Sequence, residues 1–88
     1  MPHFAYLLRC ADGSLYAGYT NDLAARVYAH NHSKAGARYT KSRRPVKLAW
    51  SRAFRTKSAA MKFEAKIKGM ERAEKLAMVK TGKMVKKK

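Results

Sequence analysis

Two short runs of aromatic and aliphatic residues near the N-terminus most constrain the fold of this chain. The runs cover residues 4–9 and 15–20, and the tetrapeptide Ala-Asp-Gly-Ser separates them at residues 11–14. Aromatic residues favour strands, and an Asp-Gly pair between two such runs predicts a β-hairpin. Because side chains alternate between the two faces of a strand, the length of the turn decides which residues share a face.

Two hairpin registers fit this turn. A two-residue turn would pair Tyr6 with Tyr19 and send Tyr16 to the opposite face. A three-residue loop over residues 11–13, with Gly13 in the left-handed region, would pair Tyr6 with Gly18 instead. Tyr6 and Tyr16 would then be diagonal neighbours on one face. The residues alone leave both registers open.

Further elements follow the hairpin. Capping residues at positions 20–22 start a helix that extends to about residue 32, and alternating apolar residues predict a third strand over 46–53. Helical spacing predicts a second helix from Thr56 or Ser58 to Gly69 and a short last helix over 71–80. The apolar residues that carry these patterns are Leu23, Ala24, Val27 and Tyr28 in the first helix, Val46, Leu48 and Trp50 in the strand, Ala60, Phe63, Ile67 and Met70 in the second helix, and Leu76 and Val79 in the last.

The charge of the chain points to a polyanionic partner. Lys and Arg number 21 against 5 acidic residues, which gives a net charge of +16. Nucleic acid is the expected partner, ahead of an anionic membrane surface. No apolar run is long enough to span a membrane, and no secretion signal is present, so we expect a cytoplasmic protein. We expect a single domain over residues 1–82 and a disordered basic tail over 83–88.

Arg26 and His30 lie four residues apart, so on a helix they share one face. A guanidinium can hold a phosphate through two hydrogen bonds, and an imidazole beside it can hydrogen-bond or transfer a proton. The alternative is that both are solvated residues on the surface of a basic protein. The spacing alone leaves both interpretations open.

Glu64 is conspicuous because acidic residues are scarce in this chain. It lies in the middle of the second predicted helix, among Lys57, Lys62, Lys66 and Lys68. A hard divalent ion such as Mg²⁺ prefers oxygen ligands, and one carboxylate together with substrate phosphate and water suffices to bind it. The alternative is an ion pair between Glu64 and Lys68, one helical turn further on.

Tyr6 and Tyr16 have a structural explanation as well, because aromatic residues often serve as half-buried packing in strands. His3 and His32 have no partner at metal-ligand spacing, so a zinc site is not expected. The connection over residues 33–45 combines cations with an aromatic residue that could stack on a base. Its candidate nucleic-acid-binding residues are Lys34, Arg38, Tyr39, Lys41, Arg43 and Arg44.

Taken together, these residues resemble a known pattern. The tripeptides Phe4-Ala5-Tyr6 and Tyr16-Ala17-Gly18 are followed in order by Arg26, His30 and Glu64. This order and these separations resemble the GIY-YIG endonuclease superfamily, in particular its short, single-domain bacterial members. The resemblance covers roughly residues 4–80. The chain departs from the family pattern at the residues ahead of Tyr6, at Ala17 and in having no asparagine after Asn31.

The resemblance implies an α/β fold of the α+β type, with a small three-stranded antiparallel sheet flanked by helices. It also implies the three-residue hairpin loop, with Tyr6 and Tyr16 facing one site and Gly18 as a structural residue there. By carry-over, the catalytic residues are Tyr6, Tyr16, Arg26, His30 and Glu64. Glu64 would bind the divalent metal, Mg²⁺ or else Mn²⁺, and Arg26 would hold the scissile phosphate.

The implied activity is metal-dependent hydrolysis of nucleic-acid phosphodiesters, with DNA favoured over RNA and with 5′-phosphate and 3′-hydroxyl products. Tyr6 would help to deprotonate the attacking water, because cationic surroundings and a metal both favour tyrosinate. Tyr16 and His30 would position water or phosphate. The alternative is a DNA- or RNA-binding module of the same fold with little or no catalysis. With no recognition domain expected, specificity would come from the basic residues, a homodimer or a protein partner.

Overall fold

A computed structural model describes residues 2–32 and 42–81 of the chain. Within these residues, the chain forms a three-stranded antiparallel sheet and three helices, as the sequence predicts. The fold class is therefore α+β. The elements are β1 (His3–Arg9), β2 (Leu15–Thr20), α1 (Leu23–His32), β3 (Lys47–Phe54), α3 (Lys57–Lys68) and α4 (Arg72–Thr81).

The hairpin adopts the three-residue register. Tyr6 pairs with Gly18 and Leu8 pairs with Tyr16, so Tyr6 and Tyr16 project from the same face of the sheet. Gly13 has a φ of 85°, which lies in the left-handed region that residues with a Cβ rarely adopt. The turn chemistry therefore selects between the two registers that the sequence leaves open.

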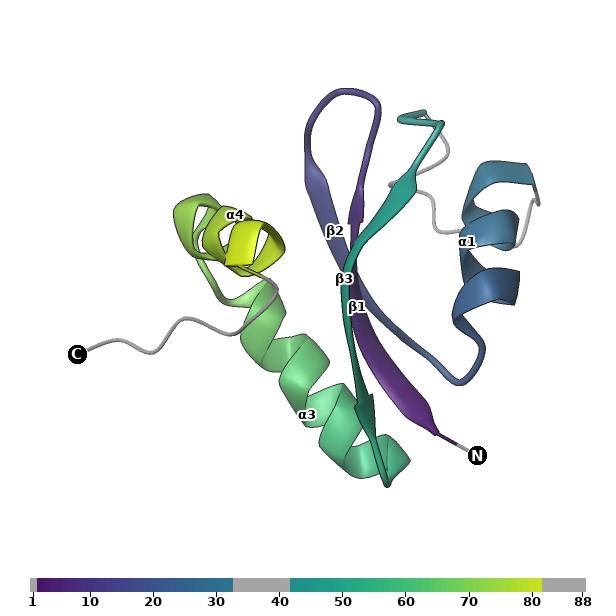
Figure 1. The fold of residues 1–88 in the computed structure, drawn as a ribbon, viewed down its shortest axis with the longest axis vertical. Helices are drawn as coiled ribbons and strands as arrows, with labels where there is room; N and C mark the ends of the chain where they lie inside the picture. The colour runs from purple at the N-terminus through teal and green to yellow at the C-terminus, as the bar shows by residue number, and fades with distance from the viewer. Residues whose placement is uncertain (1, 33–41, 82–88) are drawn as a thin grey trace.

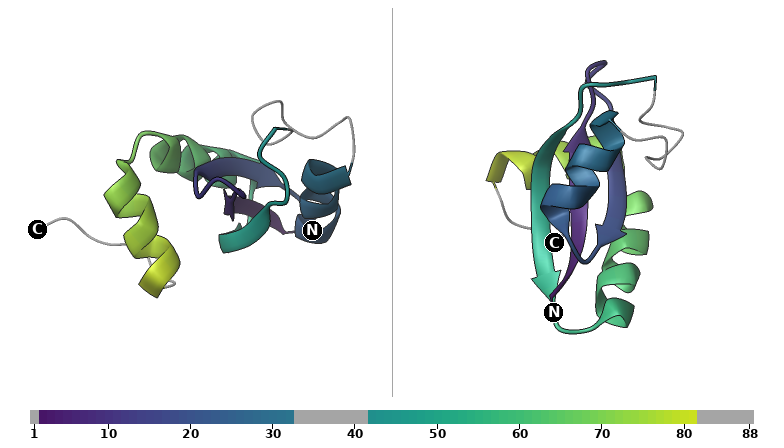
Figure 2. Two further views of the ribbon diagram at one scale, coloured as in Figure 1. Left: turned by 90° about the horizontal axis from the view of Figure 1, so that it is seen from above. Right: turned by 90° about the vertical axis from the view of Figure 1, so that its right-hand side faces the viewer.

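The molecule has three layers, with the sheet in the middle. The strand order is β2-β1-β3, so β1 is the central strand. α1 covers one face, and α3 and α4 cover the other (Figure 1). Leu8 and Val46 are buried on the α1 side, whereas Leu7, Ile67 and Met78 are buried on the α3 and α4 side. α3 runs beside the β2 edge of the sheet (Figure 2, right).

A β-bulge in β3 interrupts the alternation that the sequence suggests. Leu7 pairs with Trp50, but its neighbour Leu8 pairs with Leu48, so Ala49 is the extra residue. Trp50 consequently joins the core under α3 and α4, while Leu48 is 43% exposed on the other side. The alternation of apolar residues along the sequence does not reveal a bulge of this kind, so the sequence alone could not predict it.

The prediction for the inward face of α1 is wrong in part. Leu23 and Val27 pack against the core, but Ala24 is exposed and Tyr28 is 66% exposed. The helix is rotated so that the polar residue His30 occupies the buried side in place of an aromatic residue. α1 begins after Asp22, as predicted, where the Ala25 amide donates a hydrogen bond to Asp22 Oδ1.

The helices on the other face follow the sequence more closely. Thr56 caps α3 by accepting a hydrogen bond from the Ala59 amide, and Gly69 ends the helix. The predicted stripe of Ala60, Phe63, Ile67 and Met70 faces the core. In α4, Val79 packs against that core as predicted, and Met78, which the spacing did not single out, is fully buried.

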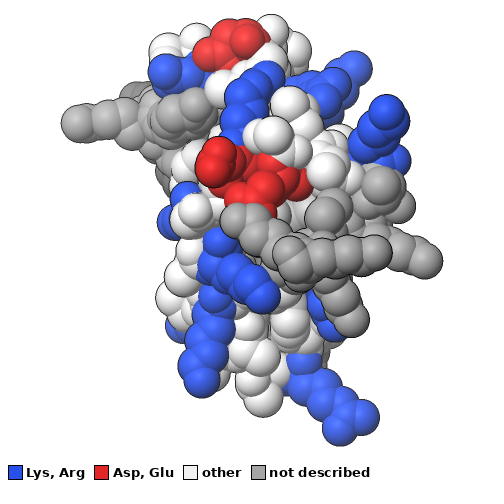
Figure 3. All heavy atoms as spheres, turned by 90° about the vertical axis from the view of Figure 1, so that its left-hand side faces the viewer, with Lys and Arg blue, Asp and Glu red and all other residues white. Residues whose placement is uncertain are grey.

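Lysine and arginine side chains spread over the face that carries α4, with acidic side chains confined to small areas (Figure 3). Among the described residues, no helix has the length and apolarity needed to cross a membrane. The tail over residues 83–88 lies outside the described residues, so its disorder stays a prediction, as does the boundary at residue 82.

Candidate active site

A pocket of about 250 Å³ opens at the β2 edge of the sheet, between α1 and α3. Residues from both faces of the sheet line this pocket because β2 is an edge strand that side chains can reach around. All of the residues predicted to be catalytic, together with Gly18, lie in its wall. The lining residues are Tyr6 from β1, Tyr16, Gly18 and Tyr19 from β2, Arg26 and His30 from α1, and Met61 and Glu64 from α3.

Gly18 allows Tyr6 to reach this edge. The two residues face each other across the β1–β2 pair, and the Tyr6 ring lies over Gly18. A Cβ at position 18 would overlap the Tyr6 hydroxyl and lie 2.5 Å from Tyr6 Cζ. Carbon atoms make favourable contact only at about 3.5–4.0 Å. Position 18 must therefore be glycine for the Tyr6 side chain to extend across β2 to the pocket.

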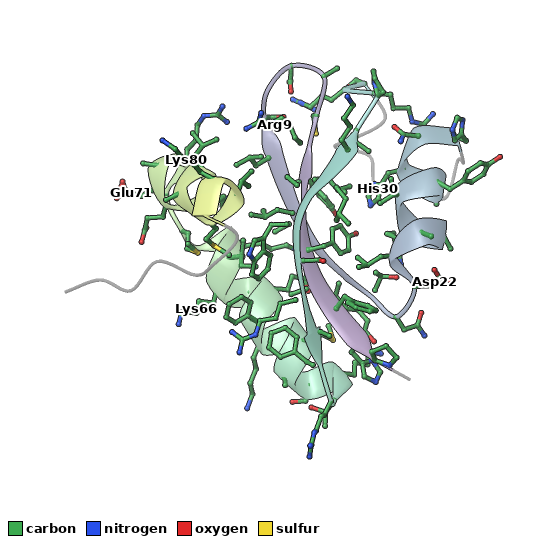
Figure 4. The ribbon with its side chains drawn as sticks, in the orientation of Figure 1. Arg9, Asp22, His30, Lys66, Glu71 and Lys80 are labelled. Atoms are coloured by element: carbon green, nitrogen blue, oxygen red, sulfur yellow. The ribbon has the colours of Figure 1, made fainter. Side chains whose placement is uncertain are left out.

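Tyr6 and His30 form a buried pair at the base of the pocket. Tyr6 Oη lies 3.1 Å from His30 Nε2, and the two side chains are among the most buried polar groups, at 2% and 1% exposed. His30 points from α1 toward the sheet (Figure 4). The Tyr16 ring packs edge-on against His30, with centroids 5.4 Å apart. The interpretation of His30 as a solvated surface residue is therefore wrong.

Burial favours the neutral form of both partners. Burial raises the pKa of Tyr6 above its ordinary value, although the nearby Arg26 guanidinium opposes this. Burial also lowers the pKa of His30, and the positive charges of Arg26 and Arg44 lower it further. Arg26 acts in the expected direction, because its positive charge lowers the pKa of Tyr6. Burial raises that pKa by more, so Tyr6 is less acidic than a free tyrosine and not more acidic as expected. At neutral pH the pair is an un-ionised phenol beside an un-ionised imidazole.

Arg26 is half-buried in the pocket wall, one turn before His30 on the same side of α1. Its effect on the pKa values of both Tyr6 and His30 shows that its charge lies close to them. An arginine in this position presents a rigid planar donor fork to an anion in the pocket. Arg26 is thus partly buried, and its role in holding a phosphate stays a prediction.

The α1 end of the pocket is fixed by the segment that leads into β3. Asn31 Oδ1 accepts a hydrogen bond from the Val46 amide at 2.7 Å, and Asn31 Nδ2 donates to the Val46 carbonyl at 3.0 Å. The Arg44 guanidinium donates to the backbone carbonyl of His30. These contacts hold the last turn of α1 against the sheet and so fix the position of the His30 ring.

Glu64 enters the pocket from α3, and its side chain is only 16% exposed. Glu64 Oε2 lies 3.0 Å from Lys68 Nζ, so the predicted alternative, an i,i+4 ion pair, is present. Within residues 2–32 and 42–81, no three side chains of His, Cys, Asp or Glu gather into a metal-binding cluster. One inward carboxylate fits a hard divalent ion that takes its other ligands from phosphate and water, and it does not fit zinc.

The predicted nucleic-acid-binding residues fall into two groups. Lys34, Arg38, Tyr39 and Lys41 lie outside the described residues. Arg43 forms an ion pair with Asp12 in the hairpin loop, with Nε 3.0 Å from Oδ2, and Arg44 contacts α1. Both arginines are only partly exposed, so part of their hydrogen-bonding capacity serves the fold.

Sequence reasoning did not select Tyr19 and Met61 as pocket residues. In the three-residue register Tyr19 lies on the face opposite Tyr6, as its pairing with Ala5 shows. It reaches the pocket because the pocket wraps around the edge of β2. Met61 is 45% exposed, whereas Ile67 and Phe63 of the same helix are buried and half-buried against the core. The sequence did contain a signal for Met61: it is an apolar residue of a lysine-rich helix, yet it lies off the stripe that faces the core.

Comparisons with known proteins agree with this geometry. A family model for the GIY-YIG catalytic domain matches residues 2–77. A UPF0213 protein of Staphylococcus epidermidis is 51% identical over 80 residues, which cover 91% of this chain and 96% of that protein. Two solution NMR structures, a UPF0213 protein from Bacillus halodurans and a protein from E. faecalis, are each 41% identical, with TM-scores of 0.58 and 0.62. Each similarity covers 92% of this chain and 85% of the other. The chain therefore belongs to the GIY-YIG catalytic domain family, and membership of this family points to a nuclease.

Proposed function

We propose that this protein is a metal-dependent endonuclease that hydrolyses phosphodiester bonds of nucleic acid, with DNA as the favoured substrate. The observation that carries the proposal is the pocket at the β2 edge. It brings a phosphate-binding cation, a buried phenol–imidazole pair and the single inward carboxylate of α3 around one volume. Binding alone has no use for a carboxylate in the wall of a pocket on a protein of charge +16.

Arg26 holds the scissile phosphate in this scheme. Its guanidinium can donate two parallel hydrogen bonds to the phosphate oxygens and stabilise the charge that accumulates on them. Because the side chain lies in a pocket wall rather than in free solvent, its electrostatic effect is stronger than that of an exposed lysine. The phosphate is thereby placed within reach of Tyr6.

Proton removal from the attacking water uses Tyr6 and His30 together. Tyr6 on its own is a poor base, because burial raises its pKa. His30 is neutral at pH 7, since its pKa is lowered, and with its proton on Nδ1 it presents Nε2 to the phenol. As water attacks phosphorus, its proton passes to Tyr6 Oη while the Tyr6 proton passes to His30 Nε2. The bond to the 3′ oxygen breaks, and the leaving oxygen takes a proton from solvent water, which gives a 3′-hydroxyl end and a 5′-phosphate end. His30 then returns the proton it received to solvent.

Glu64 is the residue that would hold a divalent ion, Mg²⁺ or Mn²⁺, with phosphate and water as the other ligands. Such an ion, when bound, supplies charge neutralisation at the phosphate. The ammonium of Lys68, which contacts Glu64 Oε2, would compete with the ion for the negative charge of this carboxylate.

The test is cleavage of a panel of single-stranded, duplex, flap and branched DNA, with RNA alongside, in Mg²⁺, Mn²⁺ or EDTA. Glu64→Gln keeps the size of the side chain and removes its charge. Glu71→Gln is the matched control, because Glu71 is an exposed acid outside the pocket (Figure 4). We expect metal-dependent cleavage that falls by roughly 10²- to 10⁴-fold in Glu64→Gln and is retained in Glu71→Gln. Absence of cleavage by the wild type, or equal cleavage by all three proteins, would favour the DNA- or RNA-binding module instead.

A further inference from the structure

One wall of the pocket has no part in the hydrolysis described above. It is formed by Tyr19 of β2, whose side chain projects from the face of the sheet opposite Tyr6, and by Met61 of α3. Met61 is one of three exposed large apolar side chains among the described residues, with Tyr28 and Leu48, and the only one of them that lines this pocket. The catalytic pocket therefore has a charged and polar side and an apolar side.

The apolar side is chemically unsuited to phosphate. A phenol ring face and a thioether offer no positive charge and no array of donors, whereas both make favourable contact with flat aromatic surfaces. In a nucleotide, only the base has such a surface. A pocket of about 250 Å³ is small for a site that encloses a whole ligand, but it accommodates one nucleotide unit from an open side.

We propose that Tyr19 and Met61 form a nucleobase subsite that binds, unstacked from its neighbours, the base next to the scissile phosphate. This inference rests on the proposed function and adds the substrate class. A base within a duplex is stacked and paired, so extracting it has an energetic cost that an already unpaired base does not incur. A subsite of this kind selects substrates with an unpaired nucleotide at the cleavage position, such as single strands, flaps and frayed ends.

The Tyr19 ring is held in place before any substrate arrives. Tyr19 Oη lies 2.7 Å from His3 Nδ1, and the two rings are nearly parallel, with centroids 5.9 Å apart. The ammonium of Lys57 lies 5.9 Å from the centre of the Tyr19 ring. A side chain fixed in this way loses little conformational freedom when a base binds, so more of the stacking energy contributes to affinity.

The experiment compares two hexamers of equal charge, one of thymidine and one of abasic tetrahydrofuran residues, and measures affinity in EDTA so that cleavage is not needed. Base–aromatic stacking supports an advantage of at least about fivefold for the thymidine hexamer with the wild-type protein. In Tyr19→Ala and in Met61→Ala we expect this advantage to shrink severalfold while affinity for the abasic hexamer stays unchanged. Tyr19→Phe should retain it, because the ring remains.

Tyr28→Ala is the matched control, since Tyr28 is an aromatic residue exposed on α1 and absent from the pocket wall. Met61→Ala guards against misfolding as an explanation, because its side chain is already 45% exposed. Equal wild-type affinity for both hexamers, or an advantage unchanged in Tyr19→Ala and Met61→Ala, overturns the subsite and leaves the nuclease proposal intact. Failure of the wild type to bind either hexamer, with no cleavage of the panel, overturns both.

Discussion

Substitution of Gly18 by alanine tests whether the close approach of Tyr6 to β2 is what shapes the active site. The added methyl group would overlap the Tyr6 hydroxyl and lie 2.5 Å from Cζ and 3.0 Å from Cε1. Tyr6 is only 2% exposed, so its ring can move only by displacing packed neighbours or by shifting outward into the pocket. Overpacking of this kind costs about 1–3 kcal/mol, and a ring displaced outward also loses the hydrogen bond to His30, a further contribution of about 0.5–1.5 kcal/mol.

Two measurements follow, the free energy of unfolding in urea and the rate of metal-dependent cleavage. Gly69→Ala is the matched control, because a Cβ there would meet only ordinary contacts at 3.6 Å and 3.8 Å, with a φ of −83°. We expect Gly18→Ala to lose stability and nearly all activity, and Gly69→Ala to lose neither. In a Tyr6→Leu background the cost of Gly18→Ala should fall, because the ring is gone. A Gly18→Ala protein with wild-type stability and rate would refute the reasoning.

Two further predictions concern the charges of the pocket. Because the pKa of His30 is lowered, the cleavage rate should be sustained at pH 7 and fall as pH drops below about 6.5, where protonation removes the Nε2 acceptor for Tyr6. A proton NMR titration of His30 checks this, and a midpoint at or above 6.5 would contradict it. The unfolded chain binds a proton at His30 more readily than the folded protein does. The free energy of unfolding should therefore fall as pH drops from 6.5 through the lower pKa that His30 has in the folded protein. Removing the ion-pair partner of Glu64 by Lys68→Ala should tighten Mn²⁺ binding about twofold to fivefold, measured by electron paramagnetic resonance titration. Lys62→Ala, an exposed lysine on the same helix, should leave Mn²⁺ affinity close to that of the wild type, and equal effects of the two substitutions would argue against competition for Glu64.

The sequence predicted the fold well where local chemistry decides the structure. The Asp-Gly turn, the Thr56 cap and the helical spacing of Ala60 and Ile67 are local signals, and the elements they predict are present. The two hairpin registers could not be separated by pattern alone. The loop conformation separates them: Gly13 has a φ of 85°, but Asp12 does not have the positive φ that a two-residue type I′ turn also requires.

The errors lie where tertiary contacts override an apolar pattern. Tyr28 was expected on the inward face of α1, but it is exposed. His30 lies on the buried side instead, where its ring pairs with the hydroxyl of Tyr6. A hydrophobic stripe cannot reveal a polar side chain whose burial is compensated by one hydrogen bond. Tyr19 and Met61 were missed for a related reason, since they join the pocket around the edge of a strand and not along one face.

The two hydrogen bonds between Asn31 and the backbone of Val46 have a consequence for how such a domain can diversify. They clamp the chain on both sides of residues 33–41, directly beside the His30 ring. Insertions or exchanges confined to residues 33–41, which keep the contact of Arg44 with His30, should therefore leave the pocket unchanged. The segment between these two residues, with Arg44 retained, is thus a point at which an engineer could attach a new recognition peptide next to an unchanged pocket.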